Sequence, residues 1–139
     1  MTIHVGMLEI NFIATPEQTR GALSIFEVVI PPGAKSPPTH FHDVEEVVYG
    51  IEGVLTFMVD GVAHEIRAGE GLVVPANAVH RFDNLHAEPC KVLSVQTPGT
   101  IGPDFYREVG VAVSAGPPDP AKMVAIMASH GLTAVPPKA

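Results

Sequence analysis

The stretch VLTFMVDGVAHEI, residues 54–66, decides the fold class of this 139-residue chain. Two apolar runs, 54–59 and 62–66, flank the dipeptide Asp60-Gly61. This dipeptide favours a type I′ turn, in which both central residues take a positive φ. The sequence therefore predicts an antiparallel β-hairpin at this point.

Further β-rich runs lie on both sides of the hairpin, and they are separated by turns rich in Pro and Gly. The runs are residues 22–30, 44–50, 72–75, 79–83 and 90–97. The chain holds 13 Gly and 14 Pro, and only 17% of its residues are charged. This pattern predicts about seven short strands between about 20 and 97, in an all-β sandwich or barrel of the jelly-roll kind.

The C-terminal part of the chain has helical patterns instead. Residues 103–108 could form a short helix. Asp119 as N-cap and Pro120 at the first helical position open a second helix, and Gly131 is placed to end it. Its apolar residues, at 123–127, are expected to pack against the barrel exterior or against a partner subunit.

Composition and charge restrict the possible partners and the location. The net charge of −7 and the lack of a basic block argue against nucleic-acid binding. No apolar run is long enough to span a membrane, residues 1–5 do not read as a secretory signal, and the single cysteine fits a reducing cytoplasm. The mean hydropathy of +0.27 favours an oligomer. We expect one domain over 1–139, with a core at about 20–97 and a helical extension at about 103–131.

The stretch HFHDVEE, residues 40–46, carries a set of metal-ligating side chains. On a strand, His40 and His42 point to the same face, and Glu46 joins them if the strand continues. Burying two imidazoles and a carboxylate in an apolar barrel is costly without a compensating ion. His80 is the natural fourth ligand. The set suits one divalent transition metal (Fe, Mn, Ni, Co, Cu or Zn) and leaves coordination positions open for catalysis.

Each of these residues also has another interpretation. An H-x-H pair alone is a weak signal. Glu45 has the opposite parity and would be the ligand if the strand were bulged, although the spacing to His42 favours Glu46. The remaining histidines are interpreted as structural or surface residues: His4, His64, His86 and His130. Cys90 has no activating neighbour except Lys91, so a catalytic thiol is not expected.

The two clusters, taken with their glycines, resemble the cupin superfamily. The first cupin motif is matched by Gly33, His40, His42, Glu46 and Gly53, with one residue more than usual before His40. The second is matched by Gly69, Pro75, His80 and Asn84, with Asn77 in place of the middle glycine. Asn tolerates the left-handed backbone region, so this departure is mild. The tail resembles that of small bacterial cupins often described as quercetin-dioxygenase-like.

The resemblance implies a double-stranded β-helix barrel, a metal held by His40, His42, Glu46 and His80, and frequently a homodimer. It does not imply one reaction. We expect a dioxygenase-type oxidoreductase acting on a small enol- or phenol-like substrate, with Glu46 as the catalytic base. The alternatives are a metal-dependent isomerase or lyase, and a non-catalytic module that binds a small molecule.

Several residues near the motifs have two open interpretations. Asn84 holds a turn or orients a ligand histidine, and Gln96 either reaches the pocket or closes its strand. Gly50 either widens the cavity or marks a bulge. Val48, Phe57 and Phe82 are candidates for an apolar wall, with core packing as the alternative. Such a wall, with only Lys35 and Arg81 nearby, favours an organic substrate over a sugar phosphate.

Overall fold

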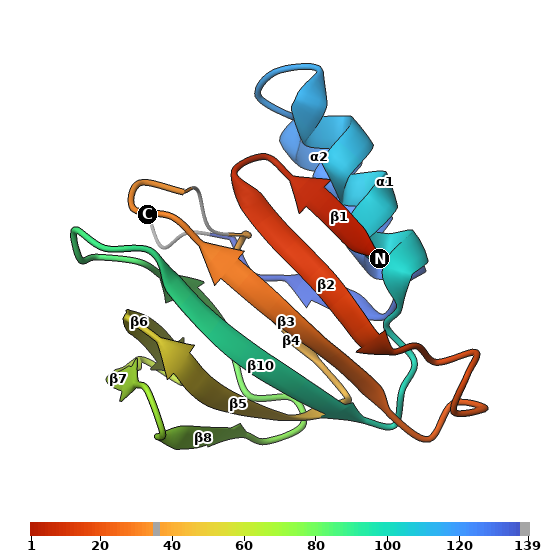
Figure 1. The fold of residues 1–139 in the computed structure, drawn as a ribbon. Coiled ribbons are helices and arrows are strands. Elements are labelled where there is room, and N and C mark those ends of the chain that lie inside the picture. Colours follow the sequence, from red (N-terminus) through yellow and green to blue (C-terminus); the bar gives the residue numbers. More distant parts are fainter. Residues whose placement is uncertain (35–36, 137–139) are drawn as a thin grey trace.

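The computed structural model describes residues 1–34 and 37–136 and consists of two β-sheets followed by two helices (Figure 1). The elements are β1 (Thr2–Val5), β2 (Leu8–Ala14), β3 (Ser24–Ile30), β4 (His40–His42), β5 (Glu45–Glu52), β6 (Val54–Val59), β7 (Val62–Arg67), β8 (Gly71–Val74), β9 (His80–Asp83), β10 (Cys90–Thr97), α1 (Pro103–Ser114), α2 (Pro120–Ser129) and β11 (Leu132–Ala134).

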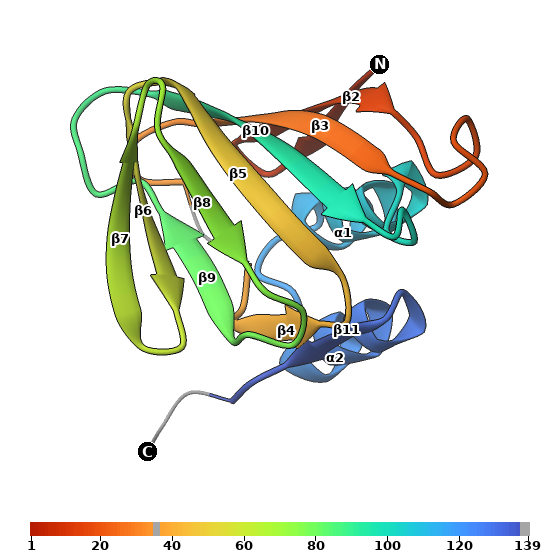
Figure 2. The same ribbon diagram turned by 90° about the horizontal axis from the view of Figure 1, so that it is seen from below.

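The strands form a six-stranded sheet in the order β1-β2-β3-β10-β5-β8 and a five-stranded sheet in the order β11-β4-β9-β6-β7. From β3 to β10, consecutive strands alternate between the two sheets except for the β6–β7 hairpin, and the sheets enclose the main hydrophobic core (Figure 2). The prediction of an all-β jelly-roll barrel with a helical tail is confirmed.

The hairpin that decided the fold class forms as predicted. β6 pairs with β7 in antiparallel register from Val54↔Arg67 to Val59↔Val62. Asp60 and Gly61 have φ values of 48° and 82°, as the type I′ turn requires. The local turn chemistry therefore fixes this register.

The sheets extend beyond the expected core of about 20–97. β1 and β2 precede it and form one edge of the larger sheet, and β11 joins the smaller sheet from the C-terminal tail. Helix α1 is longer than the predicted 103–108. Helix α2 begins as predicted, with the Asp119 carboxylate accepting a hydrogen bond from the Ala121 amide.

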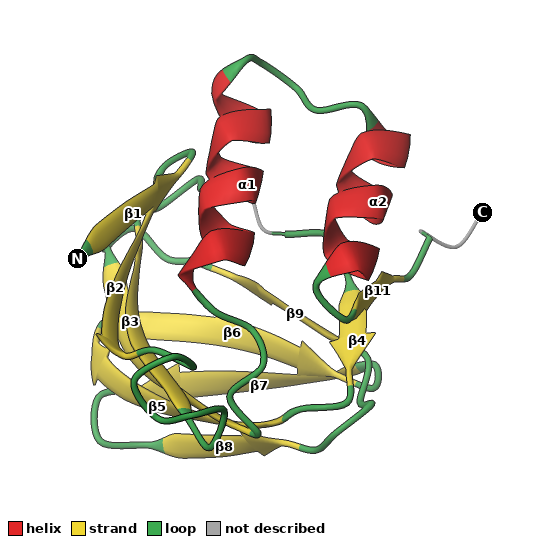
Figure 3. Ribbon diagram, turned by 90° about the vertical axis from the view of Figure 1, so that its right-hand side faces the viewer, coloured by secondary structure: helices red, strands yellow, loops and turns green. Residues whose placement is uncertain are grey.

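The two helices lie next to each other across one end of the barrel (Figure 3). Met123 and Met127 of α2 are buried with Phe105 of α1 and Leu132 of β11, in a second hydrophobic cluster. The same two methionines line the interior cavity, so the expected packing against the barrel exterior is wrong. The physical reason is β11, which pairs with β4 and so holds α2 at the barrel end.

Candidate metal centre

Three histidines of the smaller sheet converge inside the barrel. His40 and His42 lie on the same face of β4, and His40 is the register partner of His80 on β9. All three are buried, and their potential ligand atoms lie within 4.8 Å of one another. Within residues 1–34 and 37–136, this is the group of side chains that could hold a metal ion.

Each imidazole is oriented by a backbone carbonyl. The Nδ1 atoms of His40, His42 and His80 bond to the carbonyl oxygens of Pro38, Val44 and Ala78, at 2.7, 3.0 and 2.9 Å. A carbonyl oxygen only accepts, so each Nδ1 carries the proton and each Nε2 keeps a free lone pair. Metal-binding histidines are held in this way, because the bond at one ring nitrogen fixes the direction of the other.

Two of the histidines, His40 and His80, are also held in their neutral form. Burial, together with the nearby charge of a protonated His80, lowers the pKa of His40 to about 4. Burial likewise lowers the pKa of His80. Both rings therefore have an unprotonated nitrogen at neutral pH, which is the form that binds metal.

Glu46 enters the same space from the opposite sheet. Its Oε1 lies 3.5 Å from Nε2 of His42 and 3.7 Å from Nε2 of His80, and its Oε2 accepts a hydrogen bond from Ser94 Oγ at 2.6 Å. Burial raises the pKa of Glu46, but the facing imidazoles and the Ser94 hydroxyl outweigh it and hold the pKa at about 2. Glu46 is thus a carboxylate beside the histidines, whereas Glu45 is exposed on the other face of β5.

The donor set fits a divalent transition metal. Three imidazole nitrogens and one carboxylate face one region, and this mixture of ligands is typical of Fe, Mn, Co, Ni, Cu and Zn sites. The turn before β9 contributes to the frame. Asn77 has φ 68°, and its amide donates to the carbonyl of His42 at 2.7 Å, which ties the His80 segment to β4. The substitution of Asn for the motif glycine therefore keeps the required backbone conformation.

A cavity of about 660 Å³ opens from these ligands into the barrel. Its wall is mostly apolar and includes the three expected side chains, Val48, Phe57 and Phe82. Among the described lining residues, the polar side chains are those of the histidines, Glu46, Ser94, Gln96 and Tyr106. A cavity of this size and lining fits a small organic molecule.

Cationic side chains are absent from the described wall of this cavity. Arg81 lies on β9 outside the lining and is paired with Asp83, at 2.9 Å between the guanidinium and the carboxylate. Lys35 lies outside the described residues. A phosphorylated substrate would thus find no lysine or arginine among the described lining residues.

The structure answers the open questions at Gln96 and Asn84. Gln96 is buried and lines the cavity, so it does more than close its strand. Asn84 donates from Nδ2 to the carbonyls of Ile30 and Glu88, and its Oδ1 accepts from the His86 amide. Asn84 therefore holds the turn before β10 and orients no ligand histidine.

Gly50 allows a close backbone contact instead of widening the cavity. A Cβ atom at this position would lie 2.2 Å from the carbonyl oxygen of Arg67. The Gly50 amide donates to Glu70, and its carbonyl accepts from Gly69. A register irregularity between β10 and β5 lies next to Gly50. The structure therefore favours the interpretation of Gly50 as part of a bulge over the interpretation that it widens the cavity.

The other histidines and the cysteine lie away from the cavity. His86 is 3.4 Å from Glu65, and His130 contacts the carboxylate of Glu108. His64 is partly exposed on β7, and His4 is exposed on β1. Burial raises the pKa of Cys90 to about 11, so the thiol stays protonated, as expected of a non-catalytic cysteine.

Sequence reasoning missed two polar side chains of the cavity, those of Ser94 and Tyr106. Ser94 has the same strand parity as Gln96, so alternation along β10 was a signal that could have found it. Tyr106 comes from α1 and packs against Phe12 and Phe26, with ring centroids 5.8 and 5.3 Å away. No local pattern shows that a helix outside the sheets places a side chain in the barrel.

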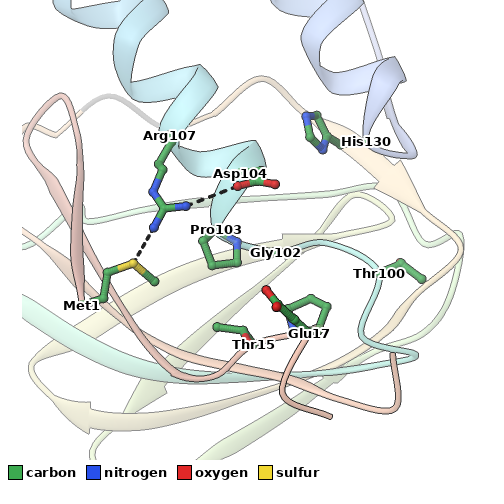
Figure 4. A pocket seen from close by; sticks show the side chains of 10 residues that line it. Met1, Thr15, Glu17, Thr100, Gly102, Pro103, Asp104, Arg107 and His130 are labelled. Carbon is green, nitrogen blue, oxygen red and sulfur yellow. Dashed lines mark hydrogen bonds and ion pairs between the residues drawn. The ribbon is translucent and has the colours of Figure 1, made fainter. Parts of the chain in front are cut away.

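A second, smaller cavity of about 330 Å³ lies at the start of α1, near the N-terminus (Figure 4). Arg107 lines it but already pairs with Asp104 at 3.2 Å and contacts the sulfur of Met1. The cavity contains none of the expected site residues. The candidate functional site is therefore the interior cavity.

The chain belongs to the Cupin_2 family, whose model, a cupin domain, matches residues 26–96. A quercetin 2,3-dioxygenase of Bacillus subtilis is 31% identical over 101 residues, which are 72% of this chain and 29% of that protein. The dimethylsulfoniopropionate lyase DddW of Ruegeria pomeroyi is 45% identical over 49 residues, or 35% of this chain and 32% of the lyase. The chain covers 29% to 60% of the length of the curated relatives it matches.

The likeness to solved structures concerns the fold. An RmlC-like cupin from Shewanella frigidimarina superposes with a TM-score of 0.63 at 22% identity, covering 76% of this chain and 87% of that one. In the described part of the chain, no helix is long and apolar enough to span a membrane.

Proposed function

We propose that this protein is a metal-dependent oxidoreductase of the dioxygenase type, acting on a small enol- or phenol-like organic substrate. The observation that carries the proposal is the convergence of three Nε2 lone pairs and the Glu46 carboxylate at the wall of a largely apolar cavity. The similarity to a quercetin 2,3-dioxygenase supports this class of reaction.

Each group of residues around the cavity has its own proposed role. His40, His42, Glu46 and His80 would hold the metal, which supplies Lewis acidity and redox chemistry when bound. The apolar wall excludes water, which strengthens electrostatic interactions within the cavity. The backbone carbonyls behind the histidines keep their lone pairs directed inward.

Glu46 is proposed as the catalytic base. It is ionised at neutral pH, and Ser94 holds its Oε2 while Oε1 faces the histidines. Its pKa of about 2 makes it a weak base, so proton transfer is favourable only from an acidified hydroxyl group. Enols and phenols meet this condition better than aliphatic alcohols.

The experiment is oxygen uptake by the metal-loaded protein with a flavonol, a catechol and a diketone. Uptake that depends on substrate and is lost with a chelator supports the proposal. Product formation without uptake would instead indicate the isomerase or lyase alternative, which the similarity to a lyase favours. Binding without turnover would indicate a non-catalytic module.

The assembly is proposed to be a homodimer. Val47 and Tyr49 of β5 and Val73 of β8 are 43%, 47% and 59% exposed, and Val47 and Val73 are register partners on the outer face. β8 is an edge strand of the larger sheet, and its apolar edge can pack against the same edge of a second copy of the chain. We also propose a single domain over 1–139. A cytoplasmic location is proposed because the one cysteine is free and buried.

A further inference from the structure

A second pair of polar groups lies in the cavity beside the candidate metal ligands. Gln96 is the register partner of Glu46 across β10 and β5, and both are buried. Tyr106 of α1 lines the same cavity, close to the Gln96 side chain. Two strands and a helix therefore bring an amide and a phenol together next to the Glu46 carboxylate.

This pair has hydrogen-bonding capacity that the protein does not use. Gln96 is only 3% exposed, yet its Oε1 has no hydrogen-bond partner. An unpaired buried amide oxygen is unfavourable, so it marks a place where a ligand can bind. The Tyr106 hydroxyl lines the same cavity, and a phenol O–H can donate to an acceptor there.

The phenol remains a donor at all relevant pH values. Burial, and after it the negative charge of Glu46, raises the pKa of Tyr106. The pair thus offers one acceptor, Gln96 Oε1, and one donor, the Tyr106 hydroxyl. The remainder of the described wall on this side is apolar, with Phe26, Val92 and Ile101 among its residues.

We propose that Gln96 and Tyr106 form a second polar subsite, which binds a hydroxyl group of the substrate beside the metal ligands. A hydroxyl group donates and accepts at once, so it satisfies both groups. A carbonyl or ether oxygen would leave Gln96 unpaired, and a phosphate or carboxylate would meet the negative Glu46. The preferred ligand is an uncharged apolar body, such as an aromatic ring, that carries a hydroxyl group. This assignment rests on the proposed function, since it names the substrate class of that site.

The test uses phenol and toluene, which differ only by a hydroxyl against a methyl group. Their dissociation constants are measured by NMR titration of the protein as purified and of three variants. Tyr106→Phe removes the hydroxyl and keeps the ring, and Gln96→Met removes the amide while keeping the length of the side chain. Tyr49→Phe is the matched control, because Tyr49 is half exposed on the outer face of β5.

We expect Tyr106→Phe and Gln96→Met each to weaken phenol binding by about three- to tenfold, the value of one or two neutral hydrogen bonds. Toluene binding should stay within about twofold, and Tyr49→Phe should change neither constant. Equal effects on phenol and toluene, or no preference for phenol in the unaltered protein, would overturn the subsite. Neither readout needs oxygen or turnover, so failure of the dioxygenase proposal would appear separately, as absent oxygen uptake.

Discussion

Glu46 and Gln96 face each other in the register of β5 against β10, so the candidate base and the unpaired amide are immediate neighbours. The three histidines come from the opposite sheet. The site is therefore formed between the two sheets, and it exists only when both sheets are closed around the cavity.

Replacing His42 by Ala should greatly reduce the metal content of the purified protein. The unaltered chain should hold close to one metal ion. Loss of a residue that only hydrogen-bonds a metal ligand typically weakens metal binding by about 10- to 100-fold, and loss of a ligand itself should weaken it more. Elemental analysis per chain checks this. His64→Ala is the matched control, because His64 lies on β7 away from the cavity. Metal content unchanged in His42→Ala would contradict the assignment.

Replacing Glu46 by Gln should retain appreciable metal but lower turnover by about 10²–10⁴-fold, the usual contribution of a general base. The amide keeps the shape and an oxygen donor but loses charge and basicity. Metal content and oxygen uptake are measured together. Glu45→Gln, on the exposed face, should leave both unchanged. Full activity in metal-bound Glu46→Gln, or equal losses in the two variants, would refute the role of Glu46.

The metal-free protein should lose stability on acidification in two pH windows. The pKa of His40 is about 4 in the folded state, below its ordinary value of 6.5. Between these two pH values the unfolded chain binds a proton at His40 and the folded chain does not, so the free energy of unfolding falls as the pH falls through this range. Glu46 has a folded pKa of about 2 against 4.5, so its contribution is present above 4.5 and is lost toward pH 2.

Urea unfolding with chelator, repeated from pH 7 to pH 4, measures the first window. His40→Gln should flatten the pH dependence of the free energy of unfolding, whereas His64→Gln should not. An unchanged slope in His40→Gln would show that His40 is not held neutral by folding.

The homodimer should dissociate when its proposed apolar edge becomes charged. Val73→Lys places a charge in the middle of the exposed apolar face of β8, which disfavours edge pairing. Light scattering at micromolar concentration should then give the mass of one chain for this variant and of two for the parent. Val111→Lys, at an exposed valine of α1, should remain dimeric. A monomeric parent would contradict the proposed assembly.

Gly50→Ala should destabilise the fold, because its Cβ would lie 2.2 Å from the Arg67 carbonyl oxygen. Overpacking of this kind typically costs about 1–3 kcal/mol. Gly71→Ala is the control, since its Cβ would meet the nearest atom, the Val48 carbonyl oxygen, at 3.7 Å. Thermal unfolding compares the two variants. Equal melting temperatures would show that the backbone at Gly50 has room to move.

The parts of the fold that sequence reasoning predicted well are those with local chemistry. The hairpin follows from Asp60-Gly61, and β10 from the β-rich run 90–97, and both agree with the structure to within about one residue at each end. The alternation of Leu8, Ile10 and Phe12 along β2 carried the same kind of signal but was not used. β11 has three residues, which is too short for any period to be seen.

In the candidate site, too, the residues placed by local spacing were predictable and the contacts made by tertiary packing were not. The i, i+2 spacing of His40 and His42 placed both on one face, and parity separated Glu46 from Glu45. The contact of Gln96 with Tyr106 depends on how α1 lies across the barrel end. That placement results from tertiary packing, so no spacing in the sequence encodes it.

The strand that carries His40 and His42 has its second neighbour far along the chain. β11 pairs with β4 through Leu132↔His42 and Ala134↔His40, and the Val135 amide donates to the Thr39 carbonyl. During synthesis on a ribosome, β4 emerges long before β11 and keeps one edge unpaired until residue 134 is free. Contacts so distant in sequence form late and slowly. The frame of the candidate metal centre is therefore complete only after the C-terminal tail has folded onto β4.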